Sequence, residues 1–398
     1  MNKLSLLISE KANTILPQLT AIRRHFHAHP ELSFSEYSTS NYIKSFLTEN
    51  NISFTEDWVK TGIVATIKGQ EEGRLIAFRA DMDALPIQEE NEVSYKSTQE
   101  GIMHACGHDV HMACMMGAIL IIDEFSSQLK GEVMFIFQPG EEKLPGGAKL
   151  MLEQGIFNER KPELIIGQHV YNVLPAGKVG HRSGQYMASA DEIYISVKGK
   201  GGHAALPHLN DDTVLSACQT INSLQQVVSR KSNPLIPSVL SFGKIFSIGG
   251  ATNVIPNEVK IEGTFRTMNE EWRAEAHALI HSICHSVSEA NGTHCEVEIL
   301  KGYPSLVNDE EITNRVASLM RVYLGTENVV EIAQRMTSED FAFYSQSIPG
   351  CFYRLGIANA EKGIVNPVHN SKFDIDESAL VTGSGLFAWL AFNMSNKP

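Results

Sequence analysis

Apolar residues follow two kinds of pattern along this chain. Three short apolar runs are bounded by turn residues, which is typical of strands buried on both faces of a covered, largely parallel sheet. These runs are 74–79, 132–137 and 162–167. Between them, 109–125 and 148–154 have the spacing of helices. The alternation of strands with helices predicts an α/β fold.

The stretch 191–300 has a different pattern. Apolar and polar residues alternate at 192–197 and 259–265, as in antiparallel strands with one exposed face. Helical spacing is found at 212–229 and 270–290. These elements predict a two-layer α+β insert.

The α/β pattern returns after Tyr303, with a strand at 351–355 and a final helix at 377–394. A chain of 398 residues is longer than one hydrophobic core usually supports, so two domains are expected. We predict that one domain is interrupted by a smaller one. The expected boundaries are 1–187 and 303–398 for the two parts of the larger domain, and 188–302 for the insert.

Composition excludes several classes of partner. The chain is 43% hydrophobic and 20% charged, as ordinary globular proteins are. Its net charge of −13, without a notable cluster of Lys and Arg, argues against nucleic acid and anionic membranes. Lys3, Glu10 and Lys11 interrupt the apolar N-terminal pattern, so no signal peptide is expected, and no apolar run approaches the ~20 residues that span a bilayer. The six cysteines have no framework spacing, which favours free thiols and the cytoplasm.

The run from His104 to His111 concentrates metal-binding residue types. It contains Cys106-Gly107-His108 and the histidines at both ends. A thiolate with several imidazoles suits a transition metal such as Zn²⁺ better than Mg²⁺ or Ca²⁺, which prefer oxygen ligands. A polar loop with a buried cysteine and surface histidines is about as plausible for this segment taken alone.

Other ligand-type residues follow the predicted strands. The first strand leads into Asp81 and Asp83, the second into Glu141-Glu142, and the third into His169, while His369 lies between a late strand and the last helix. Ligands of open α/β sheets bind beside the carboxyl ends of the strands, so these side chains are expected to meet at one crevice. The sequence therefore favours a metal site there.

A set of motifs in this order resembles the M20 metallopeptidase-like amidohydrolases. Within them, the chain is similar to the branch of hippurate hydrolases, auxin-conjugate hydrolases and N-acetyl-diaminopimelate deacetylases. The motifs are Arg23–Leu32, Arg79–Pro86, Met103–Asp109, Phe137–Glu142, Gly201–Ala205, Thr252–Pro256 and Ser338–Phe341. Gly140 and Val368 depart from residues that are common in the family, but neither position matches a ligand.

The resemblance implies a binuclear metal site. Members of the family hold two divalent metals (Zn²⁺, Mn²⁺, Co²⁺ or Ni²⁺), and the thiolate is able to bridge the pair. The positions that match their ligands are Cys106, His108, Glu142, His169 and His369. Glu141 matches the general base that activates water, and Asp83 matches an aspartate that orients a metal-binding histidine.

Other positions have less specific matches or competing interpretations. Asp81 orients a histidine as Asp83 does, or caps the following turn. His104 and His111 are expected beside the ligands or on the surface. His25, His27 and His29 are expected to hold the loop beneath the site.

In the insert, His203 matches a lid histidine that reaches the active site of the second subunit and stabilises the oxyanion. Asn253 and Arg266 match residues that bind the substrate carboxylate, although an exposed strand arginine is the competing interpretation of Arg266. The resemblance thus implies a zinc-exopeptidase-like catalytic domain of mixed, mainly parallel sheet. It also implies a ferredoxin-like lid that forms a homodimer.

The predicted function is hydrolysis of an N-acyl amino acid to a carboxylic acid and a free amino acid. A dipeptidase or aminopeptidase of the same superfamily is the alternative within hydrolases, and it needs an acidic group for the substrate amine that the sequence does not indicate. A non-catalytic metal-binding homologue is the alternative from another class. Retention of Glu141 and of all five ligand positions argues against it.

Overall fold

The computed structural model describes residues 3–396 and divides into two compact units. The first unit comprises the chain up to Gly184, Val307–Ala333 and the chain from Asp340 onwards. The second comprises Gln185–Leu306 and Gln334–Glu339. Each unit has a hydrophobic core of its own.

The first unit contains most of the helices and strands. Its helices are α1 (Lys3–Thr14), α2 (Leu16–Ala28), α3 (Tyr37–Glu49), α4 (His108–Glu124), α5 (Gly147–Glu153), α8 (Glu310–Leu324), α9 (Phe341–Ser345) and α10 (Ala379–Met394). Its strands are β1 (Ser53–Trp58), β2 (Gly62–Lys68), β3 (Glu71–Asp81), β4 (Lys130–Gln138), β5 (Leu164–Pro175), β6 (Val179–His181), β15 (Val329–Glu331) and β16 (Gly350–Ala358). β7 (Gly184–Met187) and β14 (Leu306–Asn308) lie at the boundaries between the units along the chain.

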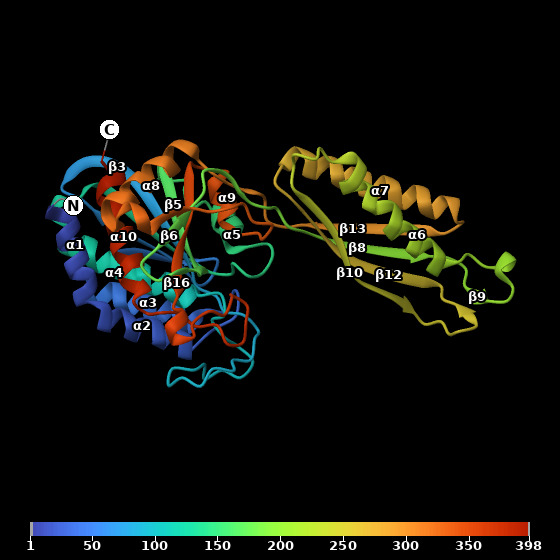
Figure 1. Ribbon diagram of the computed structural model, residues 1–398, viewed down its shortest axis with the longest axis horizontal. Coiled ribbons are helices and arrows are strands. Elements are labelled where there is room, and N and C mark those ends of the chain that lie inside the picture. The colour runs from blue at the N-terminus through green and yellow to red at the C-terminus, as the bar shows by residue number, and fades with distance from the viewer. Residues whose placement is uncertain (1–2, 397–398) are drawn as a thin grey trace. The chain divides into compact units, whose positions relative to one another are not determined.

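The eight strands β1 to β6, β15 and β16 form one mixed sheet in the order β1-β2-β4-β3-β5-β16-β6-β15. The central strands β4, β3, β5 and β16 are parallel, and so is the pair β6 and β15. The remaining neighbours are antiparallel. Because side chains alternate between the faces of a strand, Phe352 packs against Phe341 of α9, whereas Tyr353 packs against Phe387 of α10. Helices therefore cover both faces of this sheet (Figure 1).

Helices α4 and α10 pack closely against each other because small residues lie where they meet. A Cβ atom added at Gly117 would lie 2.7 Å from Ser384, and one added at Gly383 would lie 2.4 Å from the sulfur of Cys114. Both helices are almost completely buried. This packing places the first turn of α4 at the end of the central strands.

The second unit has the chain order β-α-β-β-α-β of a ferredoxin-like fold. Its elements are β8 (Asp191–Lys198), β9 (Gly202–His203), α6 (Thr213–Gln226), β10 (Ser238–Ile248), β11 (Val254–Ile255), β12 (Glu258–Thr267), α7 (Glu270–Ala290) and β13 (His294–Lys301). The antiparallel sheet has the order β10-β12-β8-β13. The second unit also has the short helices η2 (Pro207–Leu209) and η3 (Val227–Lys231), and the first unit has η1 (Ser126–Gln128), η4 (Thr326–Asn328) and η5 (Ala360–Lys362).

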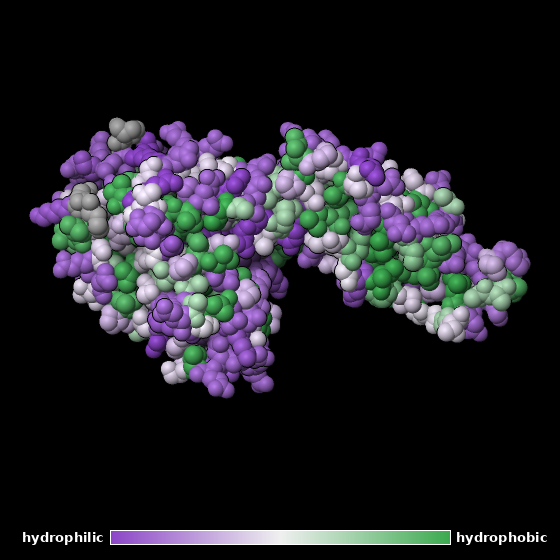
Figure 2. Space-filling model, in the orientation of Figure 1, coloured by the Kyte–Doolittle hydropathy of each residue, from purple (hydrophilic) through white to green (hydrophobic). Residues whose placement is uncertain are grey.

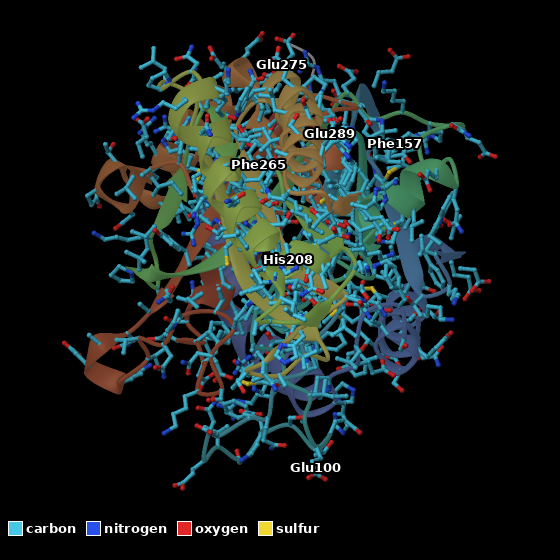
Figure 3. The ribbon with its side chains drawn as sticks, turned by 90° about the vertical axis from the view of Figure 1, so that its right-hand side faces the viewer. Glu100, Phe157, His208, Phe265, Glu275 and Glu289 are labelled. Carbon is cyan, nitrogen blue, oxygen red and sulfur yellow. The ribbon has the colours of Figure 1, made fainter. Side chains whose placement is uncertain are left out.

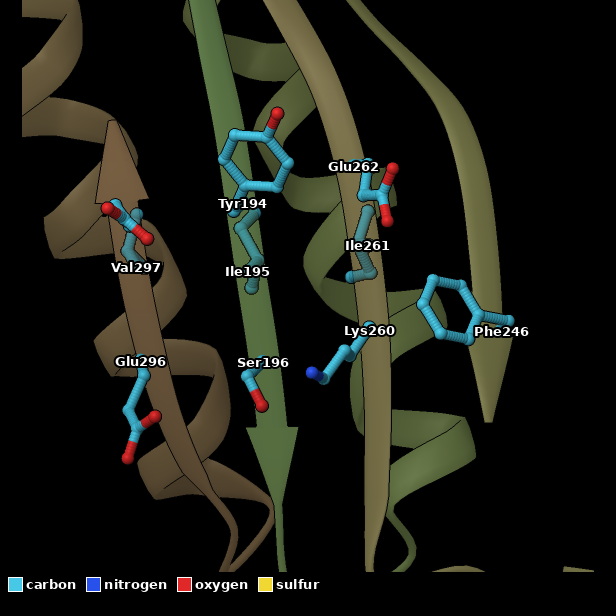
Figure 4. Close-up of a pocket in the computed structure, with 10 residues that line it drawn as sticks. Tyr194, Ile195, Ser196, Phe246, Lys260, Ile261, Glu262, Glu296 and Val297 are labelled. Atoms are coloured by element: carbon cyan, nitrogen blue, oxygen red, sulfur yellow. The ribbon is translucent and has the colours of Figure 1, made fainter. Parts of the chain in front are cut away.

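The two faces of this second sheet differ in polarity. Ile193, Ile195 and Phe265 belong to the core formed with α6 and α7, while Glu275 and Glu289 on α7 are exposed (Figure 3). The opposite face carries Tyr194, Ser196, Phe246, Lys260, Glu262, Glu296 and Glu298, which line a shallow hollow (Figure 4). The alternating pattern of the sequence is thus that of a sheet covered on one face.

The predicted fold class is confirmed, and most expected elements agree with the structure within a few residues. The third predicted strand is the exception, because β5 continues past residue 167 to Pro175. Beyond Gly167 this strand loses its partner β3 but stays paired with β16. His169 therefore lies within a strand, two residues beyond the last pair that joins β5 to β3.

Candidate metal centre

A tight turn presents Cys106 and His108 at the start of α4. Gly107 between them has a left-handed backbone with φ of 81°. A Cβ atom there would lie 2.6 Å from the side chain of Val170. Glycine is the residue that fits both constraints. The turn thereby holds a thiol and an imidazole on either side of one residue.

Three of the predicted ligands form a buried group. Ligand atoms of Cys106, His108 and His169 all lie within 4.8 Å of one another. The sulfur of Cys106 is 3.4 Å from Nε2 of His169, and Nδ1 of His169 is 2.9 Å from the carbonyl oxygen of Val170. Because Nδ1 donates to that oxygen, Nε2 of His169 is left with a lone pair directed at the group.

The other two predicted ligands extend the group to one side. Cys106, Glu142 and His369 form a second set within 4.8 Å, and Glu141 and Glu142 form a third with His108. Nε2 of His369 is 3.3 Å from a carboxylate oxygen of Glu142. The backbone N–H of His369 donates to the carbonyl of Ala105, which ties this late segment to the Cys106 turn. The structure thus brings all five predicted ligand positions together.

Asp83, just after the end of β3, is hydrogen-bonded both to His108 and to the segment Glu141-Glu142. Its two carboxylate oxygens accept the backbone N–H groups of Glu141 and Glu142, at 3.0 and 2.9 Å. Its carbonyl oxygen is 2.8 Å from Nδ1 of His108. The carboxylate is also 3.3 Å from the same nitrogen, so Nε2 of His108 is directed away from Asp83. Asp83 therefore holds the paired glutamates and one imidazole in a fixed relation.

Asp81 and His111 form a second buried chain of hydrogen bonds. Nδ1 of His111 donates to Asp81 at 2.5 Å, and Nε2 of His111 accepts the backbone N–H of Val170 at 3.0 Å. Asp81 also accepts a bond from Arg79. Both nitrogens of His111 are occupied, and this ring fixes the backbone next to His169. Asp81 is therefore the partner of His111 and Arg79 rather than the cap of the turn.

The remaining histidine of the motif has a different environment. His104 is buried, and neither of its ring nitrogens has a hydrogen-bond partner among residues 3–396. Burial lowers the pKa of His104 to about 4, so the ring is neutral at pH 7. It belongs to none of the ligand groups described above.

Negative charge surrounds the group. Burial disfavours protonation of His108, but Asp81 and Asp83 outweigh that effect and raise the pKa of His108 to about 10. Burial, together with the charges of Glu142 and Glu141, raises the pKa of the Cys106 thiol well above its usual value. The carboxylates around the cluster thus favour positive charge there.

Comparison with known proteins agrees with this geometry. The model of Peptidase family M20/M25/M40 matches residues 77–393. The chain belongs to this family. It is 39% identical to the N-acetyl-L-cysteine deacetylase of Bacillus subtilis over 95% of this chain and 90% of that protein. It is 38% identical to thermostable carboxypeptidase 2 of Saccharolobus solfataricus over 94% and 95% of the two chains.

A solved structure from Bacillus subtilis, described as a dinuclear metal binding peptidase from the M20 family, has the same fold. It superposes with a TM-score of 0.83 at 35% identity, over 96% of this chain and 99% of that one. This chain is thus a hydrolase of the M20 family. Among residues 3–396, no helix is both long and apolar enough to cross a membrane.

The other predicted residues of this M20 hydrolase lie in the second unit. His203 on β9 pairs with Val254 on β11 in a short two-stranded sheet, and the carbonyl of Asn253 accepts the N–H of Ala204. His203 and Asn253 are exposed. Arg266 on β12 is half-buried and donates to Ser338 at 3.2 Å. His203 and Asn253 are therefore close together, and Arg266 is not the exposed strand arginine of the competing interpretation.

One buried network was not recognised in the sequence. Arg23 and His27 on α2 both bond to Asp109 at 2.8 Å, and all three side chains are fully buried. His27 also reaches Glu89 at 3.2 Å, and Arg23 reaches Asp374 at 3.0 Å. The spacing of Arg23 and His27, which puts both on one face of a helix, was the available signal. The network fixes the residue that follows His108.

Proposed function

We propose that this M20 hydrolase is a binuclear metal-dependent amidohydrolase that cleaves N-acyl amino acids. The observation that carries the proposal is the buried cluster of thiol, imidazole and carboxylate ligand atoms beside Glu141. N-acetylated, benzoylated and indole-acetylated amino acids are the substrate types. The products are a carboxylic acid and a free amino acid.

The residues fit a pair of divalent cations. Nε2 of His108 is buried and has no hydrogen-bond partner among residues 3–396. A buried polar atom without a partner is costly, and a cation would satisfy it. Cys106, His108, Glu142, His169 and His369 would hold the two ions, with Zn²⁺, Mn²⁺, Co²⁺ and Ni²⁺ as candidates. When bound, such ions polarise the amide carbonyl and make water more acidic.

Glu141 is proposed as the general base. It is 7% exposed, its backbone N–H donates to Asp83, and one of its carboxylate oxygens accepts the backbone N–H of Asp340 at 3.5 Å. Glu141 accepts a proton from the attacking water and returns it to the nitrogen of the leaving amine. Asp83 does not exchange protons in this scheme. It positions the base and the ring of His108.

Residues of the second unit complete the proposal. In the proposed homodimer, His203 donates a hydrogen bond to the oxyanion of the tetrahedral intermediate in the active site of the second subunit, and Asn253 and Arg266 bind the substrate carboxylate. Guanidinium and amide groups are suitable donors for that carboxylate. The exposed position of His203, outside the buried ligand groups, supports the proposal that it is a lid residue.

A homodimer through the second unit is part of the proposal. Leu206, Leu209, Val214, Leu215 and Val254 are each between 41 and 54% exposed. Figure 2 shows apolar surface around α6, where two of these residues lie. Large exposed apolar side chains gathered on one region are typical of interfaces. Sedimentation of the full chain will determine the oligomeric state, and a monomer at micromolar concentration contradicts this part.

A carboxypeptidase is the second candidate, since one relative at 38% identity has that name. The two activities break the same kind of bond, the amide next to a terminal amino acid. They differ in the group on the acyl side. Free dipeptides, which need an acidic partner for their amine, remain the third substrate type.

The test is amino-acid release by protein stripped with a chelator and reloaded with Mn²⁺ or Zn²⁺. The panel contains N-acetyl, N-benzoyl and indole-acetyl amino acids, N-blocked dipeptides and free dipeptides. We expect metal-restored release from the N-acyl amino acids. Preference for blocked dipeptides makes the protein a carboxypeptidase, preference for free dipeptides a dipeptidase. No release with metal bound contradicts catalysis.

A further inference from the structure

The second unit contains two cysteines, Cys284 and Cys295, that pack in the same hydrophobic core. Neither is among the predicted functional residues of this unit. Cys284 is on the inner face of α7, where it is fully buried in the core. Cys295 is the second residue of β13 and packs against the same core. Both side chains thus take part in one packed cluster, Cys284 from the helix and Cys295 from the adjoining strand. A short turn of residues 291–293 joins the helix to the strand.

The two thiols differ in their access to solvent. β13 is an edge strand, and Cys295 is only partly buried. Its neighbours His294 and Glu296 are exposed, as expected for alternate residues of a half-covered strand. A reagent from solvent can therefore approach Cys295, while Cys284 is protected behind it. This is the arrangement of a reactive thiol beside a resolving thiol, which completes a disulfide after the first thiol has been oxidised.

We propose that Cys284 and Cys295 form a redox-sensitive pair that a hydroperoxide converts into an intramolecular disulfide. The Cys295 thiolate attacks one peroxide oxygen, which breaks the O–O bond, releases an alkoxide or hydroxide and leaves a sulfenic acid on Cys295. The Cys284 thiol then attacks that sulfur, and the S–O bond breaks with loss of water. Two electrons pass from the two sulfurs to the peroxide, and a thiol reductant reverses the change.

The local electrostatics agree with this order of events. The hydrogen bond from Cys284 lowers the pKa of Cys295, and the nearby Ser288 hydroxyl acts in the same direction. The same bond, together with burial, raises the pKa of Cys284. By contrast, burial raises the pKa of Cys114 and of Cys351 in the first unit to about 12. Only thiolates react readily with peroxides, so Cys295 is favoured over those buried thiols.

The experiment uses the full-length, fully reduced protein treated with hydrogen peroxide for increasing times. Remaining thiols are alkylated under denaturing conditions, and the peptides that contain each cysteine are quantified by mass spectrometry. Peptides are followed one by one, so any oxidation of Cys106 is measured separately. Cys218 on α6, which is exposed, provides the internal reference for an ordinary surface thiol.

We expect Cys295 to be lost at least about tenfold faster than Cys218, with a 284–295 cross-linked peptide as the product. In Cys284→Ser, Cys295 stops at a sulfenic acid that dimedone captures. In Cys295→Ser, Cys284 stays reduced, and Cys218→Ser behaves as wild type. Reaction of Cys295 at the rate of Cys218, or absence of the cross-link in oxidised wild type, overturns the proposal.

Discussion

The metal-centre turn and the paired strands β9 and β11 hold their predicted functional residues in opposite ways. Around the turn, side chains are buried, and each is fixed by partners from distant parts of the chain, as Asp83 fixes Glu141 and His108. Beside the β9–β11 pair, His203 and Asn253 are exposed and held by backbone hydrogen bonds. Removing one of the buried partners at the turn should therefore alter stability as well as chemistry, whereas changes at His203 or Asn253 should alter chemistry alone.

The largest effect is expected at Glu141, where chemistry can be separated from binding. Glu141→Gln keeps the shape of the side chain but removes the proton acceptor. We expect kcat to fall by about 10³–10⁴-fold. Metal content by mass spectrometry and the thermal midpoint should stay at wild-type values. Turnover at a wild-type rate would remove Glu141 from its proposed role.

The Asp109 network should show that buried partners around the turn also support the fold. Asp109→Asn leaves the buried Arg23 without its full charge partner, at an expected cost of about 3–5 kcal/mol in the free energy of unfolding. Denaturant unfolding in a chelator measures this cost. Metal affinity, measured by competition with a chromophoric chelator, should also fall because Asp109 follows His108.

Asp191→Asn is the matched control in the second unit. Asp191 is buried and accepts bonds from Arg273 and His277, at 2.5 and 2.7 Å. Hydrogen exchange should show loss of protection in α7 and β8 with unchanged metal affinity. Equal losses of metal affinity in Asp109→Asn and Asp191→Asn would contradict the proposal that only the network of the first unit supports metal binding.

A substitution at His203 tests whether an exposed residue of the second unit affects catalysis without affecting stability. His203→Ala should lower kcat by about 10²-fold through loss of an oxyanion donor. The free energy of unfolding should stay unchanged because the ring is exposed. His208→Ala is the control, since His208 is an exposed histidine of the same loop (Figure 3). Equal kinetic effects of the two substitutions would contradict a specific role for His203.

A gradual effect, spread over more than two pH units, is expected in the pH dependence of the first unit. Glu36 accepts the N–H of Gly140, and burial together with the charge of Asp83 raises its pKa from 4.5 to about 7. A raised folded pKa contributes stability that is complete below pH 4.5 and is lost as pH rises through about 7. The decline is at most about 1.4 kcal/mol per pH unit. Glu36→Gln should flatten this decline in chelator-treated protein, and an unchanged profile would exclude Glu36 as its source.

Local sequence was sufficient to predict much of the site. Cys106 and His108 are separated by one glycine, and their proximity follows from the backbone of that turn. Hydrophobic periodicity predicted the strands that lead to Asp83 and Glu142, because a strand buried on both faces requires continuous apolar residues. The family resemblance added the roles of Glu141 and His203, which remain predictions.

Several features were beyond reach of local patterns. The extension of β5 past His169 depends on pairing with β16, which is almost 200 residues away along the chain. The ion pairs of Arg23 join α2 to α4 and to Asp374. Such contacts depend on which elements pack together, and residue spacing within one segment does not contain that information.

The sequence by itself determined the chemical types at the site and their order along the chain. The tertiary structure decided which histidine has a ring nitrogen available. His111 is occupied on both nitrogens by Asp81 and Val170, whereas Nε2 of His169 faces Cys106. The physical reason is that an imidazole has only two nitrogens, and their use depends on partners that folding brings from other strands.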